Sequence, residues 1–101
     1  MNILLFGKTG QVGWELQRAL APLGNLIALD VHSTDYCGDF SNPEGVAETV
    51  RSIRPDIIVN AAAHTAVDKA ESEPKFAQLL NATSVEAIAK AANEVGAWVI
   101  H

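Results

Sequence analysis

Residues 2–13 read NILLFGKTGQVG. A mostly apolar stretch, typical of a buried strand, leads directly into three glycines, Gly7, Gly10 and Gly13, and then into a helical pattern. A glycine has no Cβ, so the backbone can turn sharply there and approach a phosphate closely. The first turn of the following helix adds unpaired N–H groups and the positive end of the helix dipole. The stretch therefore predicts a turn that binds the pyrophosphate of a dinucleotide.

A second apolar run, residues 25–29, ends at Asp30, about twenty residues beyond the glycines, where dinucleotide-binding folds carry a ribose ligand. A carboxylate there accepts hydrogen bonds from the adenosine ribose hydroxyls and repels a 2′-phosphate. No arginine occurs in residues 31–34 (VHST) to offset that charge. We therefore expect NADH to be preferred as the cofactor, with NADPH left open by His32, Ser33 and Lys8.

Gly7, Lys8 and Thr9 also resemble the end of a P-loop, which binds nucleoside triphosphates. That motif needs a glycine five residues before the one that precedes the lysine. Asn2 occupies this position, so the spacing favours the dinucleotide interpretation. A purely structural turn between strand and helix remains the alternative.

The composition describes an ordinary globular chain of 101 residues, with 49% hydrophobic residues and a net charge of −5. An excess of acidic over basic residues argues against binding to nucleic acid or to an anionic membrane. No apolar run approaches the length of a membrane span, and the chain begins directly with a strand, so we expect a cytoplasmic protein. Cys37 is the one cysteine, and no histidine or cysteine cluster has the spacing of metal ligands.

Apolar periodicity predicts strands and helices in alternation. The expected strands are 2–6, 25–30, 56–60 and 97–100, and the expected helices run from 11 to about 22, from 43 to 54, around 67–72 and from 74 to 95. Ser41 is the expected cap of the second helix, with Glu44 bonding back to it. The pattern predicts an α/β fold, a Rossmann-type parallel sheet with helices on both faces and strand order 3-2-1-4. Residues 7–13, Asp30 and residues 60–65 would then meet at the carboxyl ends of the strands.

Several of these motifs together resemble the extended short-chain dehydrogenase/reductase family. They are Gly7-x-x-Gly10-x-x-Gly13, Asp30, Asp39-Phe40 and residues 60–63, NAAA. Residues 60–71, NAAAHTAVDKAE, narrow the resemblance to members that reduce 4-keto sugars carried on dTDP. It implies hydride transfer from NADH or NADPH to the C4 keto group of dTDP-4-dehydro-L-rhamnose, giving dTDP-L-rhamnose. The resemblance extends over the whole of this chain but over only about a third of such an enzyme. Residues 1–101 are therefore expected to be the N-terminal part of the enzyme's dinucleotide-binding domain.

The resemblance also implies cofactor contacts for particular residues. These are Gly7, Gly10, Gln11, Val12 and Gly13 at the pyrophosphate, Asp30 at the adenosine ribose, Asp39 and Phe40 at the adenine, and Ala62, Ala63, His64 and Thr65 on the nicotinamide side. Phe40 would act through its backbone or as an apolar wall. His64 is equally well interpreted as a histidine hydrogen-bonded at a strand end. Val67 and Asp68 would border the sugar-nucleotide pocket.

The chain departs from the family at its catalytic residues, a Tyr-x-x-x-Lys pair and a Ser or Thr. Tyr36 is the single tyrosine, and four residues later stands Phe40. We therefore expect no catalytic residue in this chain, cofactor binding without turnover, and self-association through the exposed edge of the last strand. A sugar-nucleotide epimerase or dehydratase, or a non-catalytic relative such as the regulatory subunit of methionine adenosyltransferase, remains an alternative that residues after His101 would distinguish.

Overall fold

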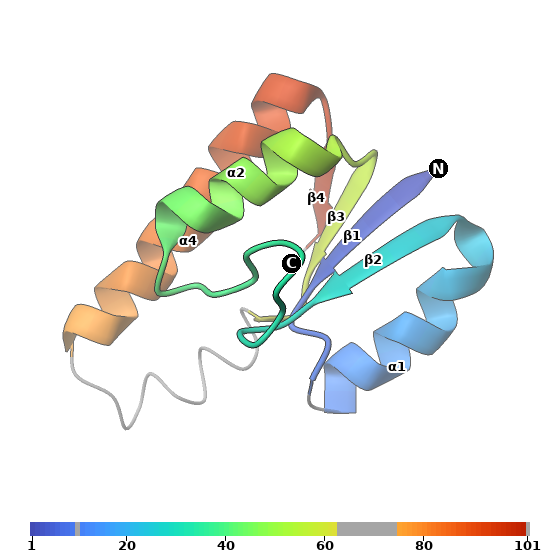
Figure 1. The fold of residues 1–101 in the computed structure, drawn as a ribbon, viewed down its shortest axis with the longest axis horizontal. Coiled ribbons are helices and arrows are strands. Elements are labelled where there is room, and N and C mark those ends of the chain that lie inside the picture. Colours follow the sequence, from blue (N-terminus) through green and yellow to red (C-terminus); the bar gives the residue numbers. More distant parts are fainter. Residues whose placement is uncertain (10, 63–74, 101) are drawn as a thin grey trace.

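A computed structural model describes residues 1–9, 11–62 and 75–100. Its sheet has four strands, β1 (Asn2–Phe6), β2 (Asn25–Leu29), β3 (Ile57–Asn60) and β4 (Trp98–Ile100), in the order β2-β1-β3-β4 (Figure 1). Every pairing is parallel. The predicted α/β class and parallel sheet are thus confirmed, and the strand limits agree with the expected ones to within a residue.

The helices cover both faces of this sheet. They are α1 (Gln11–Leu20), which continues into a 3-10 turn at Ala21–Leu23, α2 (Pro43–Ile53) and α4 (Lys75–Val95). In Figure 1, α2 and α4 run side by side on one face and α1 lies on the other. The expected helical piece at 67–72 lies outside the described residues. No helix in the described parts of the chain is both long and apolar enough to cross a membrane.

The expected strand order 3-2-1-4 is wrong, because β3 pairs with β1 and not with the outer edge of β2. β1, buried from Ile3 to Phe6, lies between two strands in either order. The two orders differ in whether β3 or β2 takes the place at the edge, and β2 is the edge strand here. β2 is only partly buried along Leu26–Ala28, as suits an edge strand. A right-handed crossover from β2 back over β1 to β3 also places α2 on the face opposite α1, as observed.

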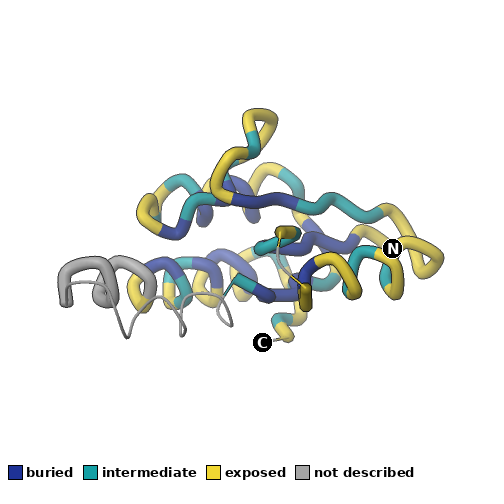
Figure 2. Tube along the Cα trace, turned by 90° about the horizontal axis from the view of Figure 1, so that it is seen from below, coloured by how far each residue is buried: buried dark blue, intermediate teal, exposed yellow. Residues whose placement is uncertain are grey.

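Alternate residues of β1 supply two separate hydrophobic clusters. Leu4 and Phe6 belong to the larger cluster, with buried residues of α2 and α4, including Val46, Val50 and Ile88. Ile3 and Leu5 belong to the smaller one, against which Leu16 and Leu20 of α1 pack. Figure 2 shows the buried residues, in dark blue, on strands and on turns of the helices, with exposed residues, in yellow, on the outer turns and loops. The period of two along a strand therefore decides which helix each side chain meets.

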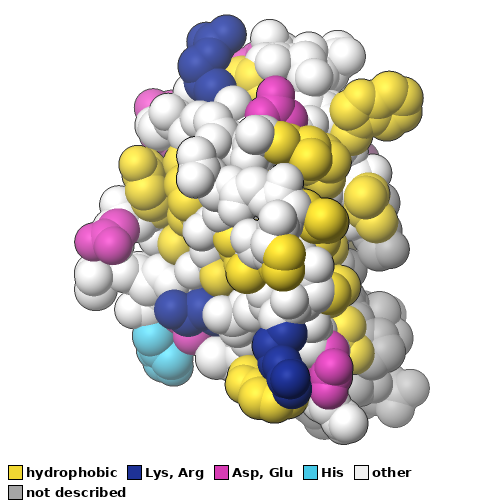
Figure 3. Space-filling model, turned by 90° about the vertical axis from the view of Figure 1, so that its right-hand side faces the viewer, with side chains coloured by type: hydrophobic (Ala, Val, Ile, Leu, Met, Phe, Trp, Pro, Cys, Tyr) yellow, Lys and Arg dark blue, Asp and Glu magenta, His cyan; other side chains and the backbone are white. Residues whose placement is uncertain are grey.

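The packing face of α1 is narrower than the sequence predicts. Helical spacing predicts one buried stripe of Val12, Leu16, Ala19, Leu20 and Leu23. Val12 is 42% exposed, Leu23 is 58% exposed and Ala19 is also exposed, so these three do not belong to it. The buried side is formed by Gly13 with the partly buried Leu16 and Leu20. Figure 3, which views the side of the molecule carrying α1 and β2, shows hydrophobic side chains at the surface among charged ones.

The cap of α2 is Asn42 rather than Ser41, which corrects the expected capping box. The Asn42 side chain accepts a hydrogen bond from the Gly45 N–H at 3.0 Å, and Pro43 follows as the first helical residue. The Ser41 hydroxyl instead donates to Asp39 Oδ1 at 2.7 Å. With Ser41 as the cap, Pro43 would be the second helical residue. With Asn42 as the cap it is the first, the position that proline prefers, so the helix begins one residue later than expected.

Candidate cofactor site

The carboxyl ends of β1, β2 and β3 are joined by backbone hydrogen bonds just beyond the sheet. The N–H of Gly7, after β1, donates to the Leu29 carbonyl at the end of β2 at 2.8 Å, and the Lys8 N–H donates to the same oxygen at 3.1 Å. The Ala61 N–H, after β3, donates to the Phe6 carbonyl at 3.0 Å. The glycine turn, the segment after β2 and the segment after β3 therefore form one continuous edge.

Gly7 is required by this edge for two independent reasons. Its φ is +82°, a left-handed conformation that other residues rarely adopt. In addition, a Cβ at Gly7 would collide with the backbone nitrogen of Ala62 and approach the Ala61 carbonyl carbon to 2.9 Å. The turn after β1 thus fits against the chain after β3 only because residue 7 is glycine.

Gly13 lets the first turn of α1 approach the same bend. A Cβ on Gly13 would collide with the Gly7 carbonyl oxygen and come within 2.8 Å of the Lys8 carbonyl carbon. Gln17 secures the contact one turn later, because its Nε2 donates to the Lys8 carbonyl at 2.9 Å. The N–H groups at the start of α1, at Gln11, Val12 and Gly13, have no acceptor within the helix. They are the backbone donors available to an anion here.

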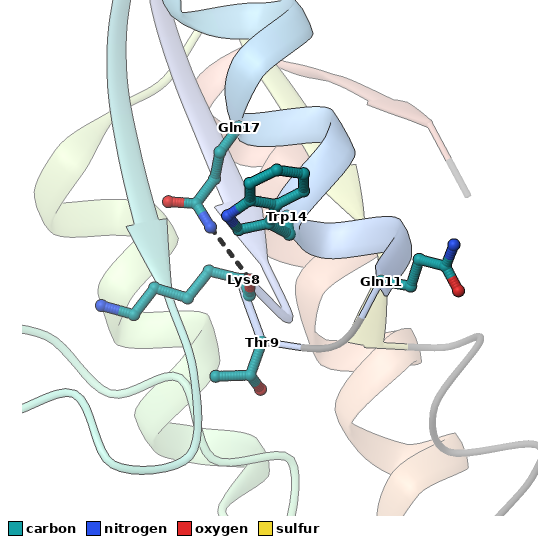
Figure 4. Close-up of a pocket in the computed structure, with 5 residues that line it drawn as sticks. All are labelled: Lys8, Thr9, Gln11, Trp14 and Gln17. Carbon is teal, nitrogen blue, oxygen red and sulfur yellow. Dashed lines mark hydrogen bonds between the residues drawn. The ribbon is translucent and has the colours of Figure 1, made fainter.

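An open cavity of about 540 Å³ lies beside this bend. It is lined by Lys8, Thr9, Gln11, Trp14 and Gln17. Figure 4 shows the Lys8 side chain extending across the carboxyl end of β2, while Gln11 points to the opposite side. The Trp14 ring is half exposed and carries the Arg18 guanidinium carbon 5.0 Å from its centroid. The cavity is therefore polar and basic on one side and aromatic on another.

Asp30 follows β2 and is held in a tight turn. The His32 N–H donates to its Oδ1 at 2.9 Å and the Ser33 hydroxyl donates to the same oxygen at 3.2 Å. The Asp30 N–H in turn donates to Ser33 Oγ at 2.9 Å. Among the described residues, no hydrogen bond reaches Oδ2 of Asp30. Asp30 as a whole residue is 9% exposed. Its Oδ2 is thus the oxygen left available at the predicted ribose position.

Asp39 and Phe40 lie on the same side of the sheet edge, at the approach to α2. Asp39 Oδ1 accepts hydrogen bonds from the N–H and the hydroxyl of Ser41 at 2.9 and 2.7 Å. The Phe40 ring is buried in the core, edge-to-face against Phe6 with ring centroids 5.5 Å apart. A buried ring offers no open apolar wall, and the Phe40 carbonyl accepts from the Ser84 hydroxyl, so the backbone N–H of Phe40 is the part that remains for an adenine.

Of the other predicted site residues, Ala62 is partly buried and lies against Gly7. Gly10, Ala63, His64, Thr65, Val67 and Asp68 lie outside the described residues. The structure therefore brings together, from three separate stretches of the chain, the described residues that the sequence predicts to contact the pyrophosphate, the ribose and the adenine.

Residues that sequence reasoning missed support the loop between β2 and α2. Ser84 is fully buried on α4, and its hydroxyl donates to the Phe40 carbonyl at 2.6 Å. The Thr49 hydroxyl donates to the Cys37 carbonyl at 2.8 Å. Asp30-x-x-Ser33 is a local turn pattern that could have indicated the role of Ser33. No sequence signal marks Ser84, because its partner is 44 residues away.

The described part of the chain contains no group of three or more histidine, cysteine or acidic side chains arranged to hold a metal ion. The ion pair between Arg51 and Glu94 at 2.8 Å joins α2 to α4 on the exposed helical side. Its hydrogen bond lowers the pKa of Glu94 and raises the pKa of Arg51. These shifts arise between helices, outside the glycine turn and the Asp30 turn.

Comparison with known proteins gives close relatives over the full chain. It is 97% identical over all 101 residues to a dTDP-4-dehydrorhamnose reductase of Escherichia coli strain K12, of which it covers 34%. It is 44% identical over its whole length to a protein of the same name from Burkholderia thailandensis, of which it covers 33%. The chain thus spans about a third of the length of these curated relatives.

Solved structures of proteins with that name share the fold. One from Bacillus anthracis, crystallised in complex with NADP, is 34% identical with a TM-score of 0.76, over 97% of this chain and 34% of that one. One from Yersinia enterocolitica is 34% identical with a TM-score of 0.78, over 97% of this chain and 33% of that one. A family model described as the RmlD substrate binding domain matches residues 1–101. Since that match extends over every residue, the chain belongs to the RmlD substrate binding domain family.

Proposed function

We propose that this chain binds a nicotinamide dinucleotide at the carboxyl edge of its sheet. It would serve as the cofactor-binding part of a reductase that converts dTDP-4-dehydro-L-rhamnose to dTDP-L-rhamnose. The observation that carries the proposal is the convergence of the glycine turn, the start of α1 and the Asp30 turn at one edge. The relatives' shared name supports the reaction, and the Bacillus anthracis complex supports the class of cofactor.

The described residues fit such a cofactor by the shape of the backbone. Gly7 and Gly13 keep the bend free of side-chain atoms where any Cβ would meet backbone. The N–H groups at the start of α1 would bind the pyrophosphate, with Gly10, Gln11 and Val12 lining it. Asp30 would accept from the adenosine ribose, Asp39 from the adenine amino group, and Ala62, Ala63, His64 and Thr65 would lie on the nicotinamide side.

When bound, the reduced nicotinamide supplies the hydride for reduction of the sugar's keto group. The work of this chain is to hold and orient the cofactor, with Val67 and Asp68 at the border of the sugar-nucleotide pocket. We propose that the 101 residues carry no catalytic residue. No lysine stands four residues after Tyr36, so this tyrosine lacks the partner that the family's catalytic pair supplies for proton transfer. The chain alone would therefore bind cofactor without turnover.

We further propose that NADH is preferred to NADPH. A 2′-phosphate on the adenosine ribose would lie near the Asp30 carboxylate, and like charges at short range repel. Lys8 extends across the end of β2 and makes no ion pair with the residues described, so its charge would reduce this penalty without reversing it. Binding of both cofactors, with NADH the tighter, is the expected result.

The test is calorimetric titration of the purified chain with NADH and NADPH, after circular dichroism has confirmed folding. Asp30→Asn keeps the size of the side chain and removes its charge. It should therefore weaken the binding of NADH and reduce the difference in affinity between NADH and NADPH. Glu44→Gln, an exposed carboxylate on α2, is the matched charge control and should leave both affinities unchanged. A folded chain that binds neither cofactor would contradict the proposed function. Tighter NADPH than NADH would contradict the preference alone.

Two further properties complete the proposal. The free edge of β4 carries the 78% exposed Trp98 and the 53% exposed Ile100, and within the described residues β4 pairs with β3 alone. Unpaired strand edges of this kind associate, so we propose that the isolated chain self-associates through β4. We place the protein in the cytoplasm, with its nicotinamide cofactor.

A further inference from the structure

We propose that Ser33 is a positioning residue that fixes the Asp30 carboxylate so that only its Oδ2 is presented to the 2′-hydroxyl of an adenosine ribose. The inference deepens the proposed function and rests on it, because it concerns the same cofactor site. The glycine and acidic-residue motif of dinucleotide binding specifies no serine three residues after the acidic residue.

The contacts of Ser33 act on both ends of Asp30. Its hydroxyl accepts from the Asp30 N–H at 2.9 Å and donates to Asp30 Oδ1 at 3.2 Å. Its N–H donates to the Asp30 carbonyl at 3.2 Å, which closes the turn. One side chain thus links the backbone and the carboxylate of Asp30, so rotation of the carboxylate would break a hydrogen bond.

The second donor to the carboxylate comes from the backbone. The His32 N–H donates to the same oxygen, Oδ1, at 2.9 Å, while the His32 side chain is exposed. With two donors, Oδ1 is occupied within the turn, and among the described residues Oδ2 accepts no hydrogen bond. The two carboxylate oxygens, chemically equivalent in a free aspartate, therefore differ here: Oδ1 holds the turn, and Oδ2 is left for the ligand.

The loop that follows keeps this turn in place. A Cβ on Gly38 would lie 2.5 Å from the Asp30 carbonyl oxygen and 3.0 Å from the Leu29 Cβ, so the returning chain packs directly on Asp30. The Thr49 hydroxyl fastens that returning chain to α2 through the Cys37 carbonyl at 2.8 Å. Asp30 is thus anchored through the β2 backbone, and the free rotation that remains is that of its carboxylate, which Ser33 restrains.

A fixed acceptor binds a hydroxyl more tightly than a mobile one, because the side chain is ordered before the ligand arrives. Loss of the restraint should therefore weaken the contact with the ribose 2′-hydroxyl and no other part of the cofactor. This separates positioning from general stability, since a loosened fold would weaken all contacts alike.

The experiment titrates the chain with NADH and with the analogue that lacks the adenosine 2′-hydroxyl. Ser33→Ala should lower NADH affinity by about five- to tenfold and analogue affinity by less than about twofold. Ser33→Thr keeps the hydroxyl and should restore NADH binding. Ser33→Cys keeps the size with a weaker hydrogen-bonding group, and should give an intermediate loss confined to NADH if the alanine variant folds poorly. Ser52→Ala, at an exposed serine on α2 whose side chain makes no hydrogen bond to the described residues, is the matched control.

The outcomes separate the two proposals. Equal losses for both ligands, or an unchanged NADH affinity in Ser33→Ala and Ser33→Cys, would overturn the role of Ser33 while leaving cofactor binding intact. Failure of the unsubstituted, folded chain to bind NADH would overturn the proposed function and the role of Ser33 with it. A loss confined to NADH and rescued by Ser33→Thr supports both.

Discussion

The hydroxyl of Ser84, fully buried on α4, donates a 2.6 Å hydrogen bond to the backbone carbonyl of Phe40. This bond fastens the end of the loop after β2 to the helix that follows the segment of predicted nicotinamide contacts. Phe40 is also buried through its ring, which meets Phe6 edge-to-face. The residue next to Asp39 is therefore fixed from both its side chain and its backbone.

Ser84→Ala is expected to lower the free energy of unfolding by about 1–3 kcal/mol, since it leaves a buried carbonyl without its donor. Urea unfolding followed by circular dichroism measures the change. Ser52→Ala removes a hydroxyl from an exposed site and should change stability by less than about 0.5 kcal/mol. Equal stabilities of the two variants would show that the Ser84 bond contributes nothing.

Gly13→Ala is expected to destabilise the chain by about 1–3 kcal/mol and to weaken dinucleotide binding, because its Cβ would meet the backbone of Gly7 and Lys8. α1 would have to move away from the bend, and its N–H groups with it. Ala19→Gly, on the exposed side of the same helix, should cost about 1 kcal/mol through helix propensity and leave affinity unchanged. Cofactor titration of both variants is the measurement, and unaltered binding by Gly13→Ala would count against the pyrophosphate site.

Arg54→Gly is expected to stabilise the chain by about 0.5–1 kcal/mol, since Arg54 ends α2 with a φ of +51°. Its N–H donates to the Val50 carbonyl at 2.9 Å, a bond that glycine retains. Gly96 ends α4 with a φ of +75° and open space around its Cβ position, so Gly96→Ala should cost about 1 kcal/mol from the backbone alone. Thermal unfolding of the two variants should shift the midpoint in opposite directions.

The Arg51–Glu94 pair gives a pH dependence of known sign. The hydrogen bond from Arg51 holds the pKa of Glu94 below its ordinary value of 4.5, so the folded state favours the ionised carboxylate. The resulting stability is present above pH 4.5 and is lost as the pH falls through the lowered pKa. Urea unfolding between pH 3 and 7 should show the difference between the unsubstituted chain and Glu94→Gln shrinking towards low pH. A difference that grows on acidification would contradict the assignment.

Trp98→Lys is expected to suppress self-association, because a charge on an edge strand opposes pairing with another copy. Val99→Pro tests the same edge through the backbone. The Trp98 N–H donates to the Asp56 carbonyl on the β3 side, so the Val99 N–H points to the free edge, and proline would remove that donor while sparing the pairing with β3. Sedimentation at increasing concentration is the measurement. If the unsubstituted chain stays monomeric at high concentration, the proposed self-association through β4 is wrong.

Much of the local structure was predictable from the sequence because its causes are local. The strand at residues 2–6 and the bend at Gly7 follow from apolar pattern and glycine chemistry, and α2 begins at Pro43 as its composition indicates. Helical spacing also predicts that Val46, Val50 and Ile53 form the buried stripe of α2, which is confirmed: Val46 and Val50 are buried, and the partly buried Ile53 packs against the same cluster. The cap was misplaced by one residue, since Ser41 and Asn42 are both good caps and Asp39 competes for the first.

The strand order was not predictable, because both the expected and the observed order place β1 between two strands and differ in where β3 pairs. Periodicity shows that residues 2–6, 25–29 and 57–60 form strands, whereas the pairing of β3 with β1, and not with β2, is a contact between segments far apart in the chain. The exposure of Val12 and Leu23 has the same origin, since a single helix over that face buries only the side that meets Ile3 and Leu5.

The sequence by itself determined the elements, the glycine turn and the acidic residue after β2, since these depend on neighbours within a few positions. Tertiary structure alone decided the strand order, the burial of the Phe40 ring and the bond from Ser84, because each needs contacts between segments far apart in the chain. The candidate cofactor site depends on both. Local chemistry sets which residues follow each strand, and the parallel pairing of the strands brings those residues to one edge of the sheet.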